Sequence, residues 1–245
     1  INVALPDIQR DLGFSPTGVQ WVASAYAIVC GGFQLLGGRF SDLLGKRRVL
    51  LIGVGLFTLV SLAAGTTGYA NFHGTVLLVI CRGLQGLAGA LIAPATLAIV
   101  NTAFPEGAQR SRALGVFGSI ATAGFASGNV IGGILTSHLG WPSIFFLNVP
   151  LGLMVLAVAP RLVPVGQEDR NSIWADLGGV DTGGAITVTT GLICLVFGAV
   201  GVHEAGWAST RTILSFAGSA VLLASFIAIE LQAKHPLVPF RVFRS

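Results

Sequence analysis

The chain contains 245 residues, of which 53% are hydrophobic and 10% are charged, and its mean hydropathy is +0.81. An ordinary soluble domain is about a quarter charged, so this composition argues against a soluble fold and indicates an all-α polytopic membrane protein. The net charge of +4 does not indicate nucleic-acid binding, because the basic residues alternate from loop to loop instead of gathering on one surface.

The uncharged stretches predict the membrane crossings, because each is long enough for a helix to cross about 30 Å of hydrocarbon. Helices are expected at 18–38, 49–68, 76–100, 113–136, 142–160, 182–201 and 211–231. Residues 1–6 are too short to span a membrane, and we interpret them as the end of a truncated helix, which makes eight crossings. The longest uncharged stretch must hold two crossings, and its break is expected within 136–143, where Trp141 suits the headgroup level.

The distribution of Lys and Arg predicts the orientation. With residues 1–18 outside, the inner segments hold 11 of the 14 basic residues, and the outer ones hold Arg10 and Arg211. The positive-inside rule then predicts a multi-pass protein of the cytoplasmic (inner) membrane, with a cytoplasmic N-terminus contributed by residues before Ile1. The inner segments are 39–48, 102–112, 161–178 and 232–245.

A charge-dense turn connects the first two full-length helices. Five charges lie within residues 39–48, between two apolar stretches that carry none. Charged side chains need water, so the turn is expected at the membrane surface. If the turn only set the orientation of the protein in the membrane, this would explain its basic residues but not Asp42 or the glycines at 38 and 45. A gate formed by the turn would explain all of them.

Arg82 is the one charge deep inside an uncharged stretch. Burying an arginine at mid-membrane costs at least about 2.5 kcal/mol, so we expect it to face a polar cavity and to serve a function. Gln85, at i+3 on the same helix face, is its expected hydrogen-bond partner. The alternative is a snorkelling arginine near a helix end.

Glycines recur at helical spacing in two of the predicted helices. In the helix predicted at 76–100, Gly83, Gly86 and Gly89 recur every three residues. In the helix predicted at 113–136, glycines recur every four residues, with one more adjacent: Gly124, Gly128, Gly132 and Gly133. In lipid, small residues allow the close backbone contact that holds helices together. Both stripes therefore predict helix–helix interfaces.

Three motifs together resemble the major facilitator superfamily. Residues 38–48 resemble its loop between helices 2 and 3, residues 81–90 its helix 4 motif, whose arginine is associated with proton coupling, and residues 124–133 its helix 5 antiporter motif. Leu43 departs from the first pattern, where a basic residue is common. Asn129 stands where the third pattern has Pro, and it retains the backbone donor whose loss bends the helix in that pattern.

Further stretches narrow the resemblance to the 14-helix drug:proton antiporters, namely 21–26, 141–152, 181–185 and 235–244. That family implies a six-helix N-terminal bundle with a truncated helix 1, then a cytoplasmic linker, an inserted transmembrane hairpin, and a cytoplasmic connector to a second half that this sequence does not contain. The corresponding ranges are 1–160, 161–181, 182–231 and 232–245.

The resemblance implies a secondary transporter that exports drugs or other amphipathic small molecules in exchange for protons. Arg82 and Gln85 would serve proton coupling, and the proton gradient would drive transport without a cofactor. In the antiporters an acidic residue lies a few positions before the stretch that residues 2–6 match, so here it would precede Ile1. The implied cytoplasmic gate consists of Gly38, Arg39, Asp42, Gly45, Lys46 and Arg47.

Candidate contacts to an amphipathic or cationic substrate lie on helices that line the cavity of the resembled fold: Trp21, Tyr26, Phe33, Gln34 and Asn148. Aromatic faces can bind lipophilic cations through dispersion and cation–π attraction. For each of these side chains, contact with lipid or with a neighbouring helix is the alternative.

Several other functions stay open or are set aside. An intramembrane enzyme would need facing catalytic groups or metal ligands, and neither HExxH nor GxSxG occurs, so no catalytic or metal-binding residue is expected. An uptake symporter or a narrow-substrate exporter would share the same fold. A non-transporting membrane receptor or assembly factor is the remote alternative, which loss of the acidic residue in helix 1 would favour.

Overall fold

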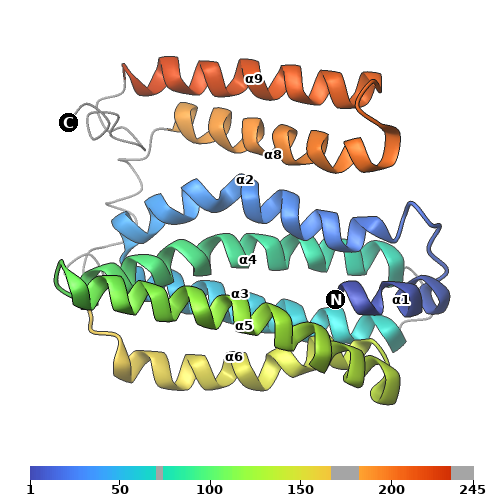
Figure 1. Ribbon diagram of the computed structural model, residues 1–245, viewed down its shortest axis with the longest axis horizontal. Coiled ribbons are helices and arrows are strands. Elements are labelled where there is room, and N and C mark those ends of the chain that lie inside the picture. The colour runs from blue at the N-terminus through green and yellow to red at the C-terminus, as the bar shows by residue number, and fades with distance from the viewer. Residues whose placement is uncertain (70–73, 167–181, 233–245) are drawn as a thin grey trace.

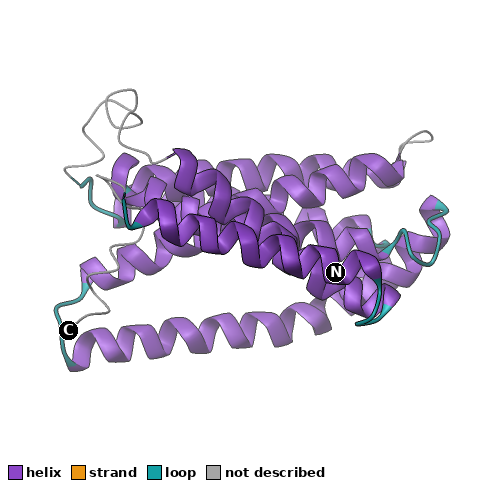
Figure 2. Ribbon diagram, turned by 90° about the horizontal axis from the view of Figure 1, so that it is seen from above, coloured by secondary structure: helices purple, strands orange, loops and turns teal. Residues whose placement is uncertain are grey.

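The computed structural model describes residues 1–69, 74–166 and 182–232, and every regular element in these segments is a helix (Figures 1 and 2). The short 3-10 turns are η1 (Asn2–Ala4) and η2 (Thr67–Tyr69). The α-helices are α1 (Leu5–Leu12), α2 (Gln20–Leu44), α3 (Lys46–Thr66), α4 (Gly74–Ala103), α5 (Ala108–Leu139), α6 (Pro142–Leu162), α8 (Thr182–Ala205) and α9 (Thr210–Glu230). The prediction of an all-α polytopic membrane protein is confirmed.

Six of the described helices are long and apolar enough to cross a membrane, namely α2 to α6 and α9. Helix α8 contributes a shorter apolar stretch, Gly183–Ala199. Helix α1 has only 8 residues, which corresponds to about 12 Å and is too short to cross.

The helices lie side by side along the long axis of the molecule, in the order α9, α8, α2, α4, α3 and α6 from one side to the other (Figure 1). Helix α5 is different, because it makes few contacts, with α6, η1 and α4. Its residues 121–128 are all exposed.

The charge-dense turn is much shorter than the predicted 39–48. Helix α2 continues to Leu44 and α3 begins at Lys46, so Gly45 alone separates them. Gly45 has φ +93°, a conformation that favours glycine and reverses the chain in one residue. Helix α2 has 25 residues, or about 37 Å of helix, so its charged end extends past about 30 Å of hydrocarbon without unwinding.

The interpretation of residues 1–6 as the end of a helix is corrected. Helix α1 runs on to Leu12, with Pro6 in its first turn, where the missing N–H of Pro would have had no intrahelical acceptor. Gly13, at φ +69°, ends the helix. Ala4 and Ile8 are fully buried, so this segment is part of the bundle.

Trp141 packs inside the bundle. It lies at the start of α6, but it is only 2% exposed. Its ring contacts Phe145 edge to face, with 6.1 Å between the ring centroids. Residues of α1 and its neighbours belong to the same buried cluster, and the level of Trp141 in the membrane stays a prediction.

Two clusters of buried side chains hold the bundle together, one at each end. The cluster at the α1 end contains Ala4, Ile8, Val19, Val22, Val60, Ala64, Leu78, Cys81, Trp141 and Phe145. The cluster at the Gly45 end contains Val49, Leu50, Val54 and Ala95. Helices α3 and α4 contribute to both, so they form the centre of the bundle.

Helices α8 and α9 form an antiparallel pair that packs on α2 through α8 (Figure 1). A Cβ added at Gly32 of α2 would lie 2.5 Å from Cγ1 of Ile193, so the glycine permits this close approach. The predicted linker begins inside α6, and its residues 167–181 lie outside the described segments, as do residues 233–245 of the predicted connector.

Candidate functional site

Arg82 lies in α4 and is only 8% exposed. Its Nε donates a hydrogen bond to the carbonyl oxygen of Val22 at 2.7 Å, and its Nη1 donates to Oε1 of Gln85 at 2.8 Å. Its guanidinium carbon lies 4.5 Å from the ring centroid of Tyr26. The side chain therefore points into the bundle toward α2, and the hydrogen bond expected with Gln85 is present.

Gln85 extends these contacts to a third helix. Its Nε2 donates to Oγ of Ser61 in α3 at 2.8 Å, and both residues are fully buried. We call the set formed by the Val22 carbonyl, Tyr26, Ser61, Arg82 and Gln85 the Arg82 network. It connects α2, α3 and α4 through buried polar groups.

Local sequence explains how the network is assembled. Arg82 and Gln85 share a face of α4 because they are separated by three residues. Gly86 follows on the side of α4 that meets α2, where an added Cβ would lie 2.5 Å from the Tyr26 carbonyl oxygen. Without a side chain at Gly86, the α2 backbone approaches closely enough for Arg82 to reach the Val22 carbonyl.

The network holds a positive charge at a fixed place between helices. Two hydrogen bonds and the face of Tyr26 partly replace the water that the guanidinium loses on burial. In the part of the chain that the structure describes, no carboxylate forms an ion pair with Arg82. The arrangement can therefore attract an anionic group, or stabilise the ionised form of an acid brought next to it.

Sequence reasoning missed two members of the network. Ser61 lies among many small residues of α3, and nothing in its neighbourhood distinguishes it from a packing residue. The Val22 carbonyl belongs to the backbone and leaves no signal in the sequence. Spacing along a single helix pointed to Gln85, but contacts between helices depend on how the helices pack.

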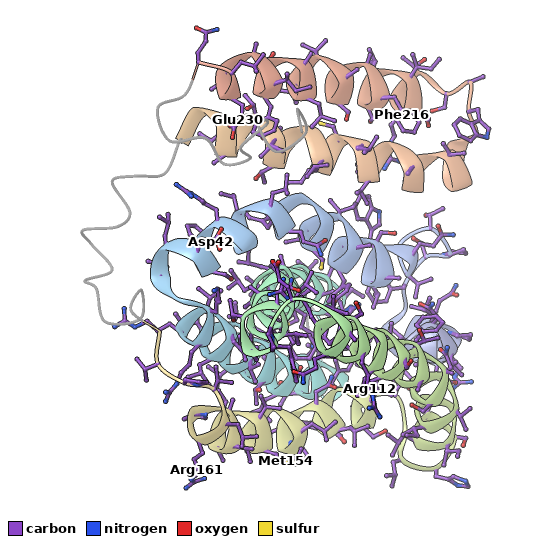
Figure 3. The ribbon with its side chains drawn as sticks, turned by 60° about the vertical axis from the view of Figure 1, so that its left-hand side comes forward. Asp42, Arg112, Met154, Arg161, Phe216 and Glu230 are labelled. Carbon is purple, nitrogen blue, oxygen red and sulfur yellow. The ribbon has the colours of Figure 1, made fainter. Side chains whose placement is uncertain are left out.

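Among the described residues, no hydrogen bond or ion pair joins Arg39, Asp42, Lys46 and Arg47 to one another. Asp42 is exposed near the end of α2 (Figure 3), and the described segments contain no hydrogen bond or ion pair to its carboxylate. The Nε of Arg39 is buried without a hydrogen-bond partner there. Lys46 and Arg47 line a pocket of about 250 Å³ with the end of α4 and residues 163–166. The expected contacts of Asp42 stay a prediction.

The two glycine stripes differ in their surroundings. In α4, added Cβ atoms at Gly86 and Gly89 would lie 2.5 Å and 2.9 Å from atoms of Tyr26, so this stripe is an interface with α2. In α5, added Cβ atoms at Gly124 and Gly128 would meet nothing within 4 Å. The described residues supply no packing partner for these two glycines, so their interface stays a prediction.

The remainder of the α5 stripe has neighbours at ordinary van der Waals distance. Added Cβ atoms at Gly132 and Gly133 would lie 3.8 Å from Ile144 and 3.6 Å from Val3. Asn129 lies within the unbroken helix α5, and its Nδ2 donates to the Phe125 carbonyl oxygen at 3.1 Å. Helix α5 thus crosses this point without losing a backbone donor.

The candidate substrate contacts are not brought together. Four of them lie on α2 and one on α6, and α3 and α4 separate these two helices (Figure 1). Tyr26 belongs to the Arg82 network, and Trp21 packs on Phe197 of α8 with 5.8 Å between ring centroids. Gln34 is exposed, while Phe33 and Asn148 are partly buried.

One buried acid escaped sequence reasoning. Glu230, the last residue of α9, is 3% exposed and lies between α8 and α9 (Figure 3). A carboxylate at the end of a long apolar stretch is expected to reach water, so only the packing of the hairpin shows its burial. Among the described residues, no group of His, Cys, Asp or Glu side chains could hold a metal ion.

Long apolar helices joined by close glycine contacts, with one buried guanidinium network, define a polytopic α-helical membrane protein. The chain belongs to the Major Facilitator Superfamily, whose family model matches residues 1–229. This confirms the family expected from the three motifs.

Several curated relatives match nearly the whole chain. A cephamycin export protein from Amycolatopsis lactamdurans is 38% identical, over 99% of this chain and 48% of the relative. A puromycin resistance protein from Streptomyces alboniger is 37% identical, over 98% and 45%, and a multidrug resistance protein from Mycobacterium tuberculosis is 34% identical, over 100% and 43%. The chain spans about half the length of the curated relatives it matches.

Proposed function

We propose that this chain forms the N-terminal part of a secondary transporter that exports drugs or other amphipathic small molecules in exchange for protons. The observation that carries the proposal is the Arg82 network, a buried fixed charge shared by three helices. The export and resistance functions named for the relatives support the direction of transport. The proposal concerns the full-length transporter, and these 245 residues alone are expected to transport nothing.

Proton coupling would use the charge of Arg82 to control an acid. Ile1 packs on the cluster that contains Val22 and Cys81, next to the network, so an acidic residue shortly before Ile1 would lie close to the guanidinium. A neighbouring positive charge favours the ionised carboxylate. A proton and a cationic substrate would then compete for this one carboxylate. Because only one of them can bind at a time, entry of a proton would be coupled to exit of a substrate.

The residues around Gly45 would form the cytoplasmic gate. Asp42 is exposed and is available to accept hydrogen bonds from neighbouring helix ends or to pair with an arginine when the cytoplasmic side is closed. Opening to the cytoplasm would break these contacts, as in a rocking-bundle transporter. Lys46 and Arg47 would hold the turn at the anionic inner leaflet, which gives the protein a cytoplasmic N-terminus in the cytoplasmic membrane.

Substrate binding would involve the aromatic and amide groups of α2. Trp21, Tyr26, Phe33 and Gln34 occur on this one helix, whereas Asn148 would contribute from α6. In this class of transporter the cavity forms between two halves, so the partner of these residues would be the second half of the full-length protein.

A narrow-substrate exporter is the second candidate. Two of the three relatives are named for a single compound, cephamycin or puromycin, and only one is named for several drugs. The Arg82 network serves either function equally. The breadth of the substrate range is therefore a separate question from proton coupling.

The test uses the full-length protein in everted membrane vesicles. An acid-inside gradient is imposed, and uptake of a lipophilic cationic dye is followed with and without a protonophore. We expect uptake that depends on the gradient and stops when the protonophore is added. Vesicles from cells that lack the protein provide the background.

Each other outcome points to a different function. Gradient-driven uptake of one antibiotic but of no dye would select the narrow-substrate exporter. Accumulation in right-side-out vesicles under an acid-outside gradient would select an uptake symporter. If neither vesicle type shows gradient-dependent transport of any compound, the transport proposal is wrong, and a non-transporting receptor or assembly factor becomes the better hypothesis.

A further inference from the structure

Helix α8 packs along α2, and this is the largest contact between the α8–α9 pair and the other described helices. At Gly32 of α2, an added Cβ would lie 2.5 Å from Cγ1 of Ile193 and 3.4 Å from the Thr189 carbonyl oxygen. At Gly31, an added Cβ would lie 3.3 Å from Cγ2 of Val196. Two adjacent glycines of α2 thus allow α8 to approach the α2 backbone closely.

Aromatic side chains join the same helices nearer the start of α2. The ring centroids of Trp21, in α2, and Phe197, in α8, lie 5.8 Å apart. The guanidinium carbon of Arg211, in α9, lies 4.4 Å from the centroid of the Phe197 ring. Ring–ring and cation–π contacts both favour a defined arrangement of the groups. A continuous series of contacts therefore runs from α2 through α8 to α9.

Helix α2 lies between α8 and α4 (Figure 1). Toward α4, its Val22 carbonyl accepts a hydrogen bond from Arg82, and Gly86 packs on its Tyr26 carbonyl. The helix is unbroken over Gln20–Leu44. Because the contacts on both sides of α2 are close and no break in the helix separates them, a movement of the Arg82 network with α2 would be transmitted to α8.

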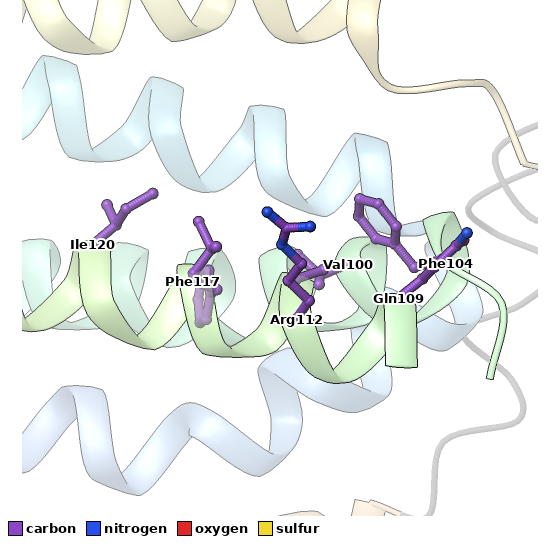
Figure 4. A pocket seen from close by; sticks show the side chains of 8 residues that line it. Val100, Phe104, Gln109, Arg112, Phe117 and Ile120 are labelled. Carbon is purple, nitrogen blue, oxygen red and sulfur yellow. The ribbon is translucent and has the colours of Figure 1, made fainter. Parts of the chain in front are cut away.

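The α2–α8 contact is formed by described residues on both sides. The groove between the end of α4 and the start of α5 (Figure 4) differs in this respect. A segment preceding Ile1 in a full-length protein would continue from η1, which packs on α5, and would cover that groove. The groove is therefore not a free surface, whereas the α2–α8 contact already has both of its partners.

We propose that the α8–α9 pair moves as one rigid body with α2, and hence with the N-terminal half, when the two halves of the full-length transporter rock against each other. This movement presupposes the proposed transport function. If the pair moved with the second half instead, α8 would have to separate from α2 in every cycle. That separation would break the packing of Ile193 on Gly32 and of Trp21 on Phe197 together, without a described group to replace either contact.

The test is a reversible cross-link between α2 and α8 in the full-length protein. The native cysteines are replaced by Ala, and Gly31→Cys/Val196→Cys is treated in everted vesicles with a short bis-methanethiosulfonate reagent, which dithiothreitol removes. The 3.3 Å between an added Cβ at Gly31 and Cγ2 of Val196 allows two thiols to be bridged there. We expect the linked peptides in mass spectrometry, and gradient-driven dye uptake equal to that of the same vesicles after reduction.

The single variants Gly31→Cys and Val196→Cys, given the same reagent, are the controls, because they cannot be linked between the helices. Uptake that is lost on cross-linking and recovered on reduction would show that α2 and α8 separate during transport, and would overturn the proposal. Absence of a cross-link in the folded protein would show that α8 does not pack on α2 in the full-length protein, and would also overturn it.

Failure of the proposed transport function gives a different result. The wild type would then show no gradient-dependent uptake, with or without reductant, and the joint movement of α2 and α8 would fall with that function. If the wild type transports but the reduced Gly31→Cys/Val196→Cys variant does not, the same measurement is made on Gly32→Cys/Ile193→Cys, in which the side chain that would collide at Gly32 is also replaced.

Discussion

The glycine stripes of α4 and α5 both recur at helical spacing, but their surroundings differ. In α4, Gly86 packs so closely on the α2 backbone that no side chain would fit, and Gly89 faces the Tyr26 hydroxyl. In α5, nothing among the described residues approaches Gly124 or Gly128. Small residues at helical spacing therefore indicate a surface that can be approached closely, but they do not identify the helix that approaches it.

The difference in packing between the two stripes matches a difference in the hydrogen bonds that their helices form. Arg82 and Gln85, on the same helix as the closed stripe, hydrogen-bond to α2 and α3, so the α2–α4 contact has both close packing and directional bonds. On the open face of α5, the hydroxyls of Ser119, Thr122 and Ser127 bond to the preceding turn of the same helix. The closed interface is therefore expected to be permanent, and the open face is free for another partner.

Substitution of Gly86 by Leu is expected to have the largest effect. The new side chain would collide with the backbone of Tyr26 and Cys30, which cannot move without separating α2 from α4. Overpacking of this kind costs about 1–3 kcal/mol or more. We expect the full-length Gly86→Leu protein to lose its monodisperse peak in size-exclusion chromatography.

Gly128→Leu is the matched control on the open stripe. Its side chain would enter free space, so the melting temperature should stay near that of the wild type. An equal loss of stability in both variants would contradict the difference between the two stripes. It would show that the α5 face is packed in the full-length protein.

Asp42→Asn tests the exposed gate residue. Since Asp42 has no partner among the described residues, the free energy of unfolding should change by less than about 0.5 kcal/mol. Loss of a charge-assisted hydrogen bond in the closed state alone should lower gradient-driven transport about tenfold. Wild-type transport rates in this variant would show that Asp42 does not act in a gate. A large loss of stability would show that Asp42 has a structural partner.

Ser61→Ala tests the link between α3 and the Arg82 network. It leaves Nε2 of Gln85 buried without its acceptor, and hydrogen bonds between membrane helices are worth about 0.6–1.7 kcal/mol. We expect a loss of about 1 kcal/mol, measured by unfolding in mixed micelles. In a double-mutant cycle with Gln85→Leu the two losses should not add, and full additivity would mean that the two side chains do not interact.

Asn129→Ala should have the smallest effect. The side chain bonds only to the preceding turn of the exposed helix α5, so unfolding should change by less than about 0.5 kcal/mol. Asn129→Pro, by contrast, removes a backbone donor and should cost about 3 kcal/mol or more in a straight helix. A proline variant as stable as the alanine variant would indicate that α5 is bent at this point in the full-length protein.

The sequence predicted the all-α membrane fold and the Arg82–Gln85 pair, because long uncharged stretches and i+3 spacing are properties of single helices. It placed the helix ends at 38 and 49 incorrectly, since charge was taken to end the helices when only Gly45 does so. It missed Ser61, the Val22 carbonyl and the burial of Glu230, because each depends on which helices become neighbours. Sequence patterns defined the faces of the helices, and packing between helices decided their contacts.

The most direct measurement compares gradient-driven dye uptake by full-length wild type, Arg82→Lys and Arg82→Ala in everted vesicles at equal protein content, with Arg161→Ala as a control. Lysine keeps the charge but cannot reproduce the two directed hydrogen bonds of Arg82. We predict that Arg82→Ala abolishes uptake, that Arg82→Lys lowers it by about 5- to 150-fold, and that Arg161→Ala leaves it unchanged. Wild-type uptake by a folded Arg82→Ala protein would contradict the claim that the Arg82 network couples transport to protons.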